Sequence, residues 1–302
     1  MSRIHDALKK AEQEREAAHA AGIFPAAQAE QLAPETTPPA APRALDESHP
    51  VSSVEALVAR CAHPTWTPEP RLAQLFSSAH VSSGSEELRT LRSRLYQIRE
   101  RQPQPLRSLL ITSALPGEGK TFLTACLGQM IVRQHERRAL MIDADLRRSQ
   151  LHMVLGAPSA PGLSDYLMGA ADELSIVQRG PTSNLFLIPG GKPVSDPAEL
   201  LANGRLKQLL ERFAKMFDWI LVDSPPVVPV HDASVLAGLS DAVLLVVRAA
   251  STPAELVQRA RVELQDKGLL GVILNQVDEG QTYHSYYYHY YGHNGTGTKK
   301  KN

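Results

Sequence analysis

A strand, a glycine-rich loop and a helix follow one another without interruption in the chain, and this succession restricts the fold more than any other feature. The apolar run at 108–113 leads into the loop, and a helix-compatible stretch begins at Phe122. The loop reads Ala114-Leu115-Pro116-Gly117-Glu118-Gly119-Lys120-Thr121. It fits the Walker A pattern in its required setting, although Ala114 stands where the usual pattern has glycine.

Phosphate binding is the chemistry that such a loop supplies. Its small residues allow successive backbone N–H groups to surround phosphate oxygens, and the following helix presents its positive N-terminal end to the same anion. Lys120 is expected to reach the β- and γ-phosphates, and the Thr121 hydroxyl to ligate Mg²⁺. ATP and Mg²⁺ are therefore the expected cofactors. The expected phosphate-binding residues are Pro116, Gly117, Glu118, Gly119, Lys120, Thr121 and Phe122.

Short apolar runs without polar alternation recur along the chain, as expected for strands that are covered on both faces. Helical stretches separate these runs, which implies right-handed crossovers between parallel strands. We therefore expect an α/β fold with a doubly wound, mostly parallel sheet. The expected strands are Ser108–Ser113, Ala139–Ile142, Leu185–Ile188, Trp219–Val222, Ala242–Val247 and Leu270–Leu274.

Charged residues follow two of these strands, at the edge where ligands of open α/β sheets bind. Asp223 fits a role in holding Mg²⁺ through water. Asp143 and Asp145 can assist the metal or accept the proton of an attacking hydroxyl, and Arg147 can neutralise phosphate charge. Asp232 either supports the nucleotide site or caps the next helix, and the cap is the favoured interpretation.

Composition divides the chain into four parts. The first carries Ile4, Leu8 and Ala11 at helical spacing, which indicates either a docking helix for a partner or a frayed, solvated helix. A helix is also expected from Ser85 to about Arg101. The expected parts are a docking helix at 1–19, a flexible Ala/Pro-rich linker and transition segment at 20–80, a P-loop domain at 81–280 and a disordered Tyr-rich tail at 281–302.

The overall charge and the cysteines exclude some classes of function. Basic and acidic residues balance at 32 each, so no nucleic-acid partner is expected. Cys61 and Cys126 have no metal-ligand or redox spacing, and we expect free thiols in a reducing cytosol. No apolar run approaches the ~20 residues of a spanning helix, so a soluble protein is expected unless a partner brings it to a membrane.

Several motifs together resemble those of the bacterial tyrosine kinases of exopolysaccharide systems, the BY-kinases, within the MinD/ParA-like P-loop group. The loop form at 116–121, the Asp-x-Asp-x-Arg motif from Asp143 and the Asp-x-x-Pro motif from Asp223 all match. An upstream Glu-x-x-Arg-x-x-Arg pattern matches as well. In such kinases it packs subunits into a ring, so the resemblance implies a homo-oligomer held by Glu86, Arg89 and Arg92.

The tyrosine-rich tail is the expected phosphate acceptor in this resemblance, with transfer in trans from a neighbouring subunit. The alternative is an aromatic low-complexity segment without assigned chemistry. The opening at 1–12 is similar to the starts of autokinases from exosortase-associated exopolysaccharide clusters. The implied partners are a membrane adaptor of the polysaccharide co-polymerase type, which recruits the cytoplasmic chain to the inner face of the membrane, and a tyrosine phosphatase. The implied acceptors are Tyr283, Tyr286, Tyr287, Tyr288, Tyr290 and Tyr291.

A MinD/ParA-like ATPase switch without kinase activity is the alternative function. Such ATPases carry a second lysine early in the loop, and Leu115 occupies that position here. The tyrosine-rich tail also argues against a switch, because such ATPases have no need of it. Asn275 resembles the position from which related ATPases contact adenine, and capping of a turn is an equal alternative.

Overall fold

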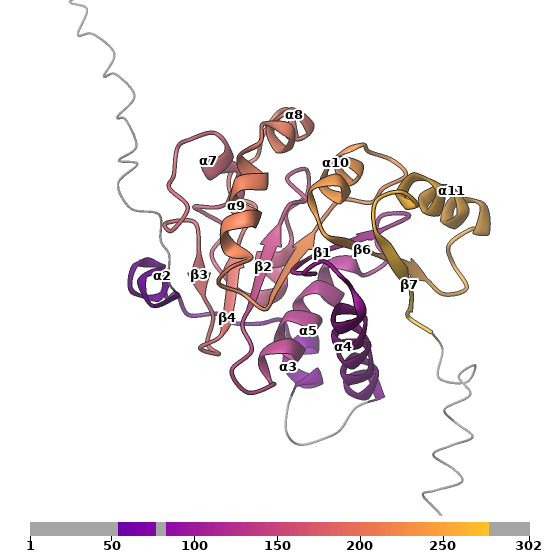
Figure 1. Ribbon diagram of the computed structural model, residues 1–302, viewed down its shortest axis with the longest axis horizontal. Coiled ribbons are helices and arrows are strands. Elements are labelled where there is room, and N and C mark those ends of the chain that lie inside the picture. Colours follow the sequence, from indigo (N-terminus) through magenta and orange to yellow (C-terminus); the bar gives the residue numbers. More distant parts are fainter. Residues whose placement is uncertain (1–53, 77–82, 278–302) are drawn as a thin grey trace, which may run out of the picture. The chain divides into compact units, whose positions relative to one another are not determined.

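The computed structural model describes residues 54–76 and 83–277 (Figure 1). The predicted helix at 1–19, the tail at 281–302 and its tyrosines lie outside these residues. Within the described residues, no helix is long and apolar enough to cross a membrane. Cys61 and Cys126 are buried, free thiols.

A seven-stranded sheet forms the centre of the molecule, in the order β3-β4-β2-β5-β1-β6-β7. Every neighbouring pair is parallel except β3 and β4. The predicted doubly wound and mostly parallel sheet is therefore confirmed, and the short β3 was not foreseen. The strands are β1 Ser108–Ser113, β2 Ala139–Asp143, β3 Gln178–Arg179, β4 Leu185–Ile188, β5 Trp219–Asp223, β6 Ala242–Arg248 and β7 Leu269–Asn275.

Helices cover both faces of this sheet. Apolar side chains of α3, α4, α5 and α6 pack against one face, and those of α2, α7, α8, α9, α10 and α11 against the other. The predicted helix at 85–101 is confirmed as α4. The helices are α2 Val54–Arg60, α3 Pro70–Leu75, α4 Ser83–Arg101, α5 Lys120–Val132, α6 Leu151–Leu155, α7 Leu163–Leu167, α8 Pro197–Ala202, α9 Arg205–Phe213, α10 Asp232–Leu239 and α11 Ala254–Leu264.

Local sequence explains α8 and α9. The Asp196 side chain accepts a hydrogen bond from the Glu199 amide and caps α8, with Pro197 at the first helical position. The buried positions of α9 recur at i, i+3, i+4 and i+7, so one stripe of this helix faces the sheet. These buried side chains are Leu206, Leu209, Leu210 and Phe213.

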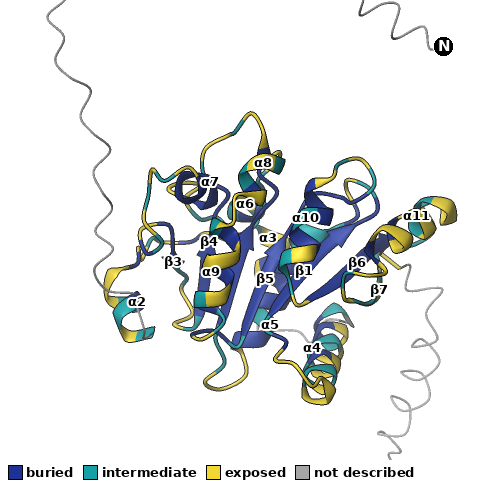
Figure 2. Cartoon of the chain, turned by 45° about the horizontal axis from the view of Figure 1, so that its top comes forward, coloured by how far each residue is buried: buried dark blue, intermediate teal, exposed yellow. Residues whose placement is uncertain are grey.

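Strands β1, β2 and β5 are buried along their whole length, as their dark blue colour in Figure 2 shows. Alternate residues of one strand serve different layers: Leu110 packs with one apolar cluster, whereas Leu109 and Ile111 pack with the other. Continuous apolar runs are needed here because both faces of the sheet exclude water. The carboxyl ends of these three strands are thereby held in fixed relative positions.

Residues 54–76 differ from the prediction of a linker and transition segment. Leu57 is buried against one face of the sheet, and Trp66 and Leu72 are buried against the other. The Ala62 amide donates to Val177, and the Arg179 amide donates to Ala62, at 3.1 and 2.8 Å. The prediction did not include this packing, because the hydrogen-bond partners of Ala62 are more than a hundred positions away and local composition does not reveal them.

Candidate nucleotide and phosphoryl-transfer site

The Walker A loop connects β1 to α5, and its glycines have the backbone conformation that the motif requires. Gly117 and Gly119 have φ of 82° and 92°, in the left-handed region that side chains disfavour. Gly119 also has no room for a larger residue, since a Cβ atom there would lie 2.2 Å from Nδ2 of Asn275. Helix α5 begins at Lys120, directly after the loop, so its N-terminal end faces the phosphate position.

The side chain of Glu118 holds the loop in shape. Its Oε2 accepts a hydrogen bond from the Leu115 amide at 2.7 Å. Its Oε1 accepts from the Arg248 amide at 3.3 Å and from the Thr252 hydroxyl. Glu118 was predicted only as a phosphate-binding position, and this bracing of the loop against the end of β6 was missed. No local signal could have revealed it, because the partners are 130 and 134 positions away.

Lys120 lies at the mouth of the loop, between a hydroxyl and a carboxylate. Its Nζ is 3.2 Å from Oδ2 of Asp145 and 3.2 Å from the Thr121 hydroxyl. The side chains of Lys120 and Asp145 are only 12% and 7% exposed, so water screens this ion pair weakly. The structure therefore brings together three of the predicted site residues.

Asp143 and Asp223 are direct neighbours in the register of β2 and β5. The Asp143 carboxylate is tightly held: Oδ2 accepts from the Ser149 hydroxyl at 2.7 Å and the Leu151 amide at 2.9 Å. Its Oδ1 accepts from the Asp145 amide at 3.2 Å. Ser149 was not predicted as a site residue. A serine six positions after an aspartate has no recognisable pattern.

Asp223 has fewer partners than its neighbour. The Thr124 hydroxyl lies 3.5 Å from Oδ1, and Oδ2 is buried without a hydrogen-bond partner among the described residues. Burial raises the pKa of Asp143 to about 6 and that of Asp223 to about 7, and the Lys120 charge opposes both shifts. A buried, unpartnered carboxylate oxygen is costly, and a bound cation would relieve that cost.

The oxygen atoms at this site fit Mg²⁺, a hard cation that prefers carboxylates and hydroxyls and keeps several waters. Thr121, Asp143 and Asp223 are the residues that could hold it. In the described part of the chain, no three His, Cys, Asp or Glu side chains gather as a complete metal site. Such an ion would therefore need phosphate oxygens and water as further ligands, as Mg²⁺ in nucleotide sites has.

Arg147 lies against a carboxylate. Its Nε and Nη2 donate to the two carboxylate oxygens of Asp232 at 2.7 and 2.9 Å, and Asp232 is 1% exposed. The favoured interpretation of Asp232 as a helix cap is wrong, because His231 is the N-cap residue of α10 and Asp232 lies within the helix. The predicted role of Arg147 at phosphate stays untested, and the contact that the structure shows is this bidentate pair.

The end of β7 contacts the loop through Asn275. The Nδ2 of Asn275 donates to the Glu118 carbonyl at 2.8 Å, and its Oδ1 accepts from the Gln276 amide at 3.0 Å. Asn275 thus stabilises a turn and touches the phosphate loop, while its predicted contact with adenine stays a prediction. Phe122, at the start of α5, is half-buried against the apolar cluster on that face.

The residues predicted to join subunits lie on α4. Arg89 forms an ion pair with Glu86 one turn earlier, and both side chains are nearly half exposed. Arg92 donates to the Met130 carbonyl at 3.0 Å, which ties α4 to α5. Glu86 and Arg89 are therefore available at the surface, whereas Arg92 also serves packing within the chain.

Comparisons with known proteins identify relatives of this chain, although no family model matches it. The tyrosine-protein kinase CpsD of Streptococcus agalactiae is 34% identical over 182 residues, which cover 59% of this chain and 79% of CpsD. AmsA of Erwinia amylovora is 34% identical over 226 residues, which cover 74% of this chain but 30% of AmsA. The chain thus spans less than a third of that longer relative.

A solved structure agrees with these relatives. The kinase domain of the Escherichia coli tyrosine kinase ETK superposes with a TM-score of 0.65 and is 32% identical, covering 73% of this chain and 85% of that domain. The similarity thus extends over most of a solved kinase domain and over most of CpsD. The chain belongs to the family of bacterial tyrosine kinases.

Proposed function

We propose that the chain is an ATP-dependent protein-tyrosine kinase that phosphorylates tyrosines of its own C-terminal segment. The observation that carries the proposal is the convergence of Lys120, Asp143, Asp145 and Asp223 beside the Walker A loop, in a chain related to tyrosine kinases. The acceptor candidates are Tyr283, Tyr286, Tyr287, Tyr288, Tyr290 and Tyr291.

Each site residue has a physical role in this reaction. Lys120, held 3.2 Å from Asp145, exchanges that partner for the β- and γ-phosphates when nucleotide binds. Asp145, released from Lys120 by that exchange, accepts the proton of the tyrosine hydroxyl, while Ser149 and Leu151 keep Asp143 fixed. The transfer relies on positioning and charge stabilisation rather than on a covalent enzyme intermediate.

Thr121, Asp223 and Asp143 would hold Mg²⁺ beside the phosphates. The ion, when bound, neutralises charge on the phosphate oxygens. The unpartnered Oδ2 of Asp223 supports this assignment most directly, because a buried carboxylate oxygen requires either a proton or a cation.

Lys120→Met tests the kinase directly. In a host without other kinases of this family, the variant is expected to lose tail phosphotyrosine completely, as measured by mass spectrometry of the purified protein. The fold should survive, because Lys120 contributes a charged contact and no core packing. Lys207→Met, on the exposed side of α9, is the matched control and should keep wild-type phosphotyrosine.

Unchanged phosphotyrosine in Lys120→Met would refute the autokinase. The alternative function, an ATPase switch, predicts ATP hydrolysis by the wild-type protein without any phosphotyrosine. Measuring phosphate release and phosphotyrosine in the same sample therefore separates the two functions.

We further infer that transfer occurs in trans within a homo-oligomeric ring joined through α4. The surface pair of Glu86 and Arg89 can exchange its intrahelical contact for one across subunits at little cost, because exposed ion pairs contribute at most about 1 kcal/mol. Light scattering of unphosphorylated Arg89→Ala should show a smaller particle than the wild type. Arg94→Ala, exposed on the same helix, is the control. An unchanged size in Arg89→Ala contradicts the ring.

The resemblance to exopolysaccharide kinases supports a cellular role as well. In this role a membrane adaptor of the polysaccharide co-polymerase type recruits the chain to the inner face of the cell membrane. A tyrosine phosphatase reverses the modification, and the cycle regulates exopolysaccharide synthesis or export. Each phosphate adds about −1.5 to −2 charges to the tail, so several would repel one another and loosen a ring. Loss of polymer output in Lys120→Met cells would support this role, and normal output would contradict it.

A further inference from the structure

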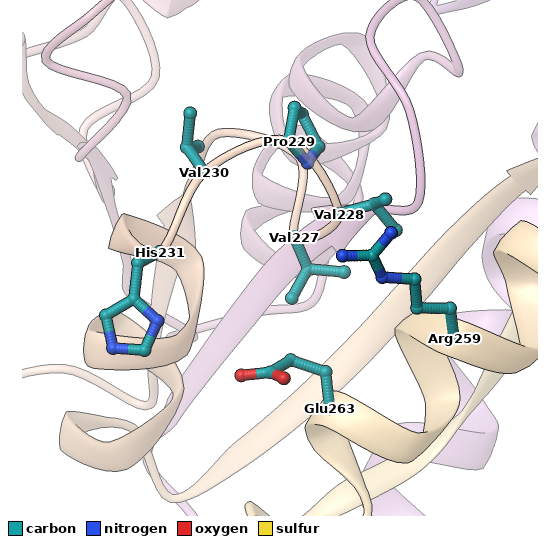
Figure 3. A pocket seen from close by; sticks show the side chains of 7 residues that line it. All are labelled: Val227, Val228, Pro229, Val230, His231, Arg259 and Glu263. Atoms are coloured by element: carbon teal, nitrogen blue, oxygen red, sulfur yellow. The ribbon is translucent and has the colours of Figure 1, made fainter. Parts of the chain in front are cut away.

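A small pocket lies beside the loop that follows β5, the strand that ends in Asp223. Figure 3 shows the loop at 227–231 on one side and two side chains of α11, Arg259 and Glu263, on the other. The accessible volume is about 220 Å³. That is below the ~300–1,000 Å³ of typical pockets for drug-sized ligands, so the pocket suits a single side chain rather than a nucleotide.

The pocket combines an apolar wall with a free cation. The side chains of Val227 and Val228 form this wall, and the Arg259 guanidinium extends from α11 toward Val228 (Figure 3). Within the described residues, Arg259 has no hydrogen-bond or ion-pair partner. An apolar surface beside an unpaired guanidinium matches an aromatic ring that carries an anionic group.

The one acidic side chain of the pocket is already compensated. Glu263 Oε1 accepts a hydrogen bond from the Ser234 hydroxyl and lies 3.4 Å from Nζ of Lys267. His231, the N-cap residue of α10, lies across the pocket from the α11 side chains (Figure 3). The charge left without a partner is therefore that of Arg259.

We propose that this pocket binds a phosphotyrosine side chain of the chain's own segment 283–291, an inference that rests on the proposed autokinase. The aromatic ring packs on Val227 and Val228, and the phosphate pairs with Arg259. Docking withdraws the product from the transfer site and shields it from a phosphatase, so the phosphorylated state persists after the transfer.

The topology places this pocket within reach of the segment. Strands β5 and β7 are parallel and end at the same edge of the sheet, three strand positions apart, which corresponds to about 14 Å. Tyr283 follows Val277 by six residues, and an extended chain spans about 20 Å over that length. Each tyrosine further along has a longer reach, so chain length does not prevent docking in the same subunit.

Binding of synthetic peptides tests the pocket without using the kinase. Fluorescent peptides of residues 281–292, phosphorylated on Tyr287, phosphorylated on Ser285 or unmodified, are titrated against full-length Lys120→Met protein. The Tyr287 phosphopeptide is expected to bind about tenfold more tightly than either other peptide, because only it carries a phosphate on an aromatic ring. Arg259→Ala should remove that preference, and Arg261→Ala, exposed on the same helix outside the pocket, should keep it.

Competition identifies what the pocket recognises. Phenyl phosphate should displace the Tyr287 phosphopeptide more effectively than inorganic phosphate, and saturating ADP with Mg²⁺ should leave it bound. Displacement by ADP would place the peptide in the nucleotide site and overturn the proposal. Equal binding of the Ser285 phosphopeptide, or full binding by Arg259→Ala, would overturn it as well. Because synthesis supplies the phosphate, these outcomes do not depend on whether the wild-type chain phosphorylates itself.

Discussion

The centre and the edge of the sheet serve different needs. Strands β2 and β5 are buried throughout and end in Asp143 and Asp223. Strand β7 is an edge strand on which Val272 and Leu274 are 48% and 64% exposed, and the tyrosine-rich segment follows it in sequence. The groups that must stay fixed are on the best-packed strands, whereas the expected substrate extends from the least packed one.

This contrast has an energetic basis. Segments with many buried apolar contacts open only with the whole domain, and exposed edges open at much lower cost. A site that positions phosphates has to lie on segments that do not open locally, because small displacements reduce the rate strongly. A segment that has to enter an active site has to move at low free-energy cost.

The largest expected effect is on the free energy of unfolding, which should depend far more on a side chain of β5 than on one of β7. Leu221→Ala, in the middle of β5 and fully buried, should lower the free energy of unfolding by about 3 kcal/mol, because it leaves a cavity in a closed core. Leu274→Ala on β7 should lower it by less than about 0.5 kcal/mol. Urea unfolding followed by circular dichroism measures both. Equal losses of unfolding free energy in the two variants would show that the edge strand is packed in solution and would refute the contrast between centre and edge.

A second effect, of intermediate size, concerns charge at the centre. The pKa of Asp223 in the fold is about 7, above the ordinary value near 3.9, so the folded state binds a proton that the unfolded state releases between those values. The free energy of unfolding therefore falls as the pH rises through this window. Asp223→Asn removes the cost of burying a charged carboxylate. It should therefore stabilise the nucleotide-free protein by about 2 kcal/mol at pH 8, and by little at pH 4.

Urea titrations of wild type and Asp223→Asn at both pH values provide the measurement, without Mg²⁺ or nucleotide. Asp266→Asn, at an exposed position after α11, should show no such pH dependence. A stabilisation that is the same at pH 4 and pH 8 would mean that packing, rather than charge, explains the change.

The smallest expected effect is on ATP binding, at the contact between the end of the edge strand β7 and the Walker A loop. Asn275→Ala removes the hydrogen bond to the Glu118 carbonyl, which is worth about 1 kcal/mol. We expect the KM for ATP to rise about fivefold with kcat nearly unchanged, because the loop loses support before the nucleotide binds. Steady-state kinetics with Leu274→Ala as the neighbouring control measures this. A fall in kcat with constant KM would instead assign Asn275 to the transfer step.

Much of the fold and part of the site could be predicted because their signals are local. Continuous apolar runs marked the parallel strands, and the Walker A spacing marked the loop. The gathering of acids beside the loop was expected from the rule that strand ends converge at one edge, whereas the ion pair of Lys120 with Asp145 was not itself predicted. These features depend on residues close in sequence or on topology alone.

The missed features depend on pairs distant in sequence. Arg147 binds Asp232 across 85 positions, and Glu118 meets Thr252 across 134. A single sequence gives no sign of such partners, since each side chain could equally face water. The packing of Leu57 onto the sheet was hidden for the same reason.

The hydrogen bonds between Ala62 and the residues around β3 have a consequence for the order in which the protein is made. Their partners, Val177 and Arg179, leave the ribosome more than a hundred residues after Ala62. Until then Ala62 lacks these partners, and closing so long a loop carries an entropic cost. The first described segment to be synthesised therefore cannot dock fully until β3 has left the ribosome, and its apolar side chains are incompletely covered over that part of translation.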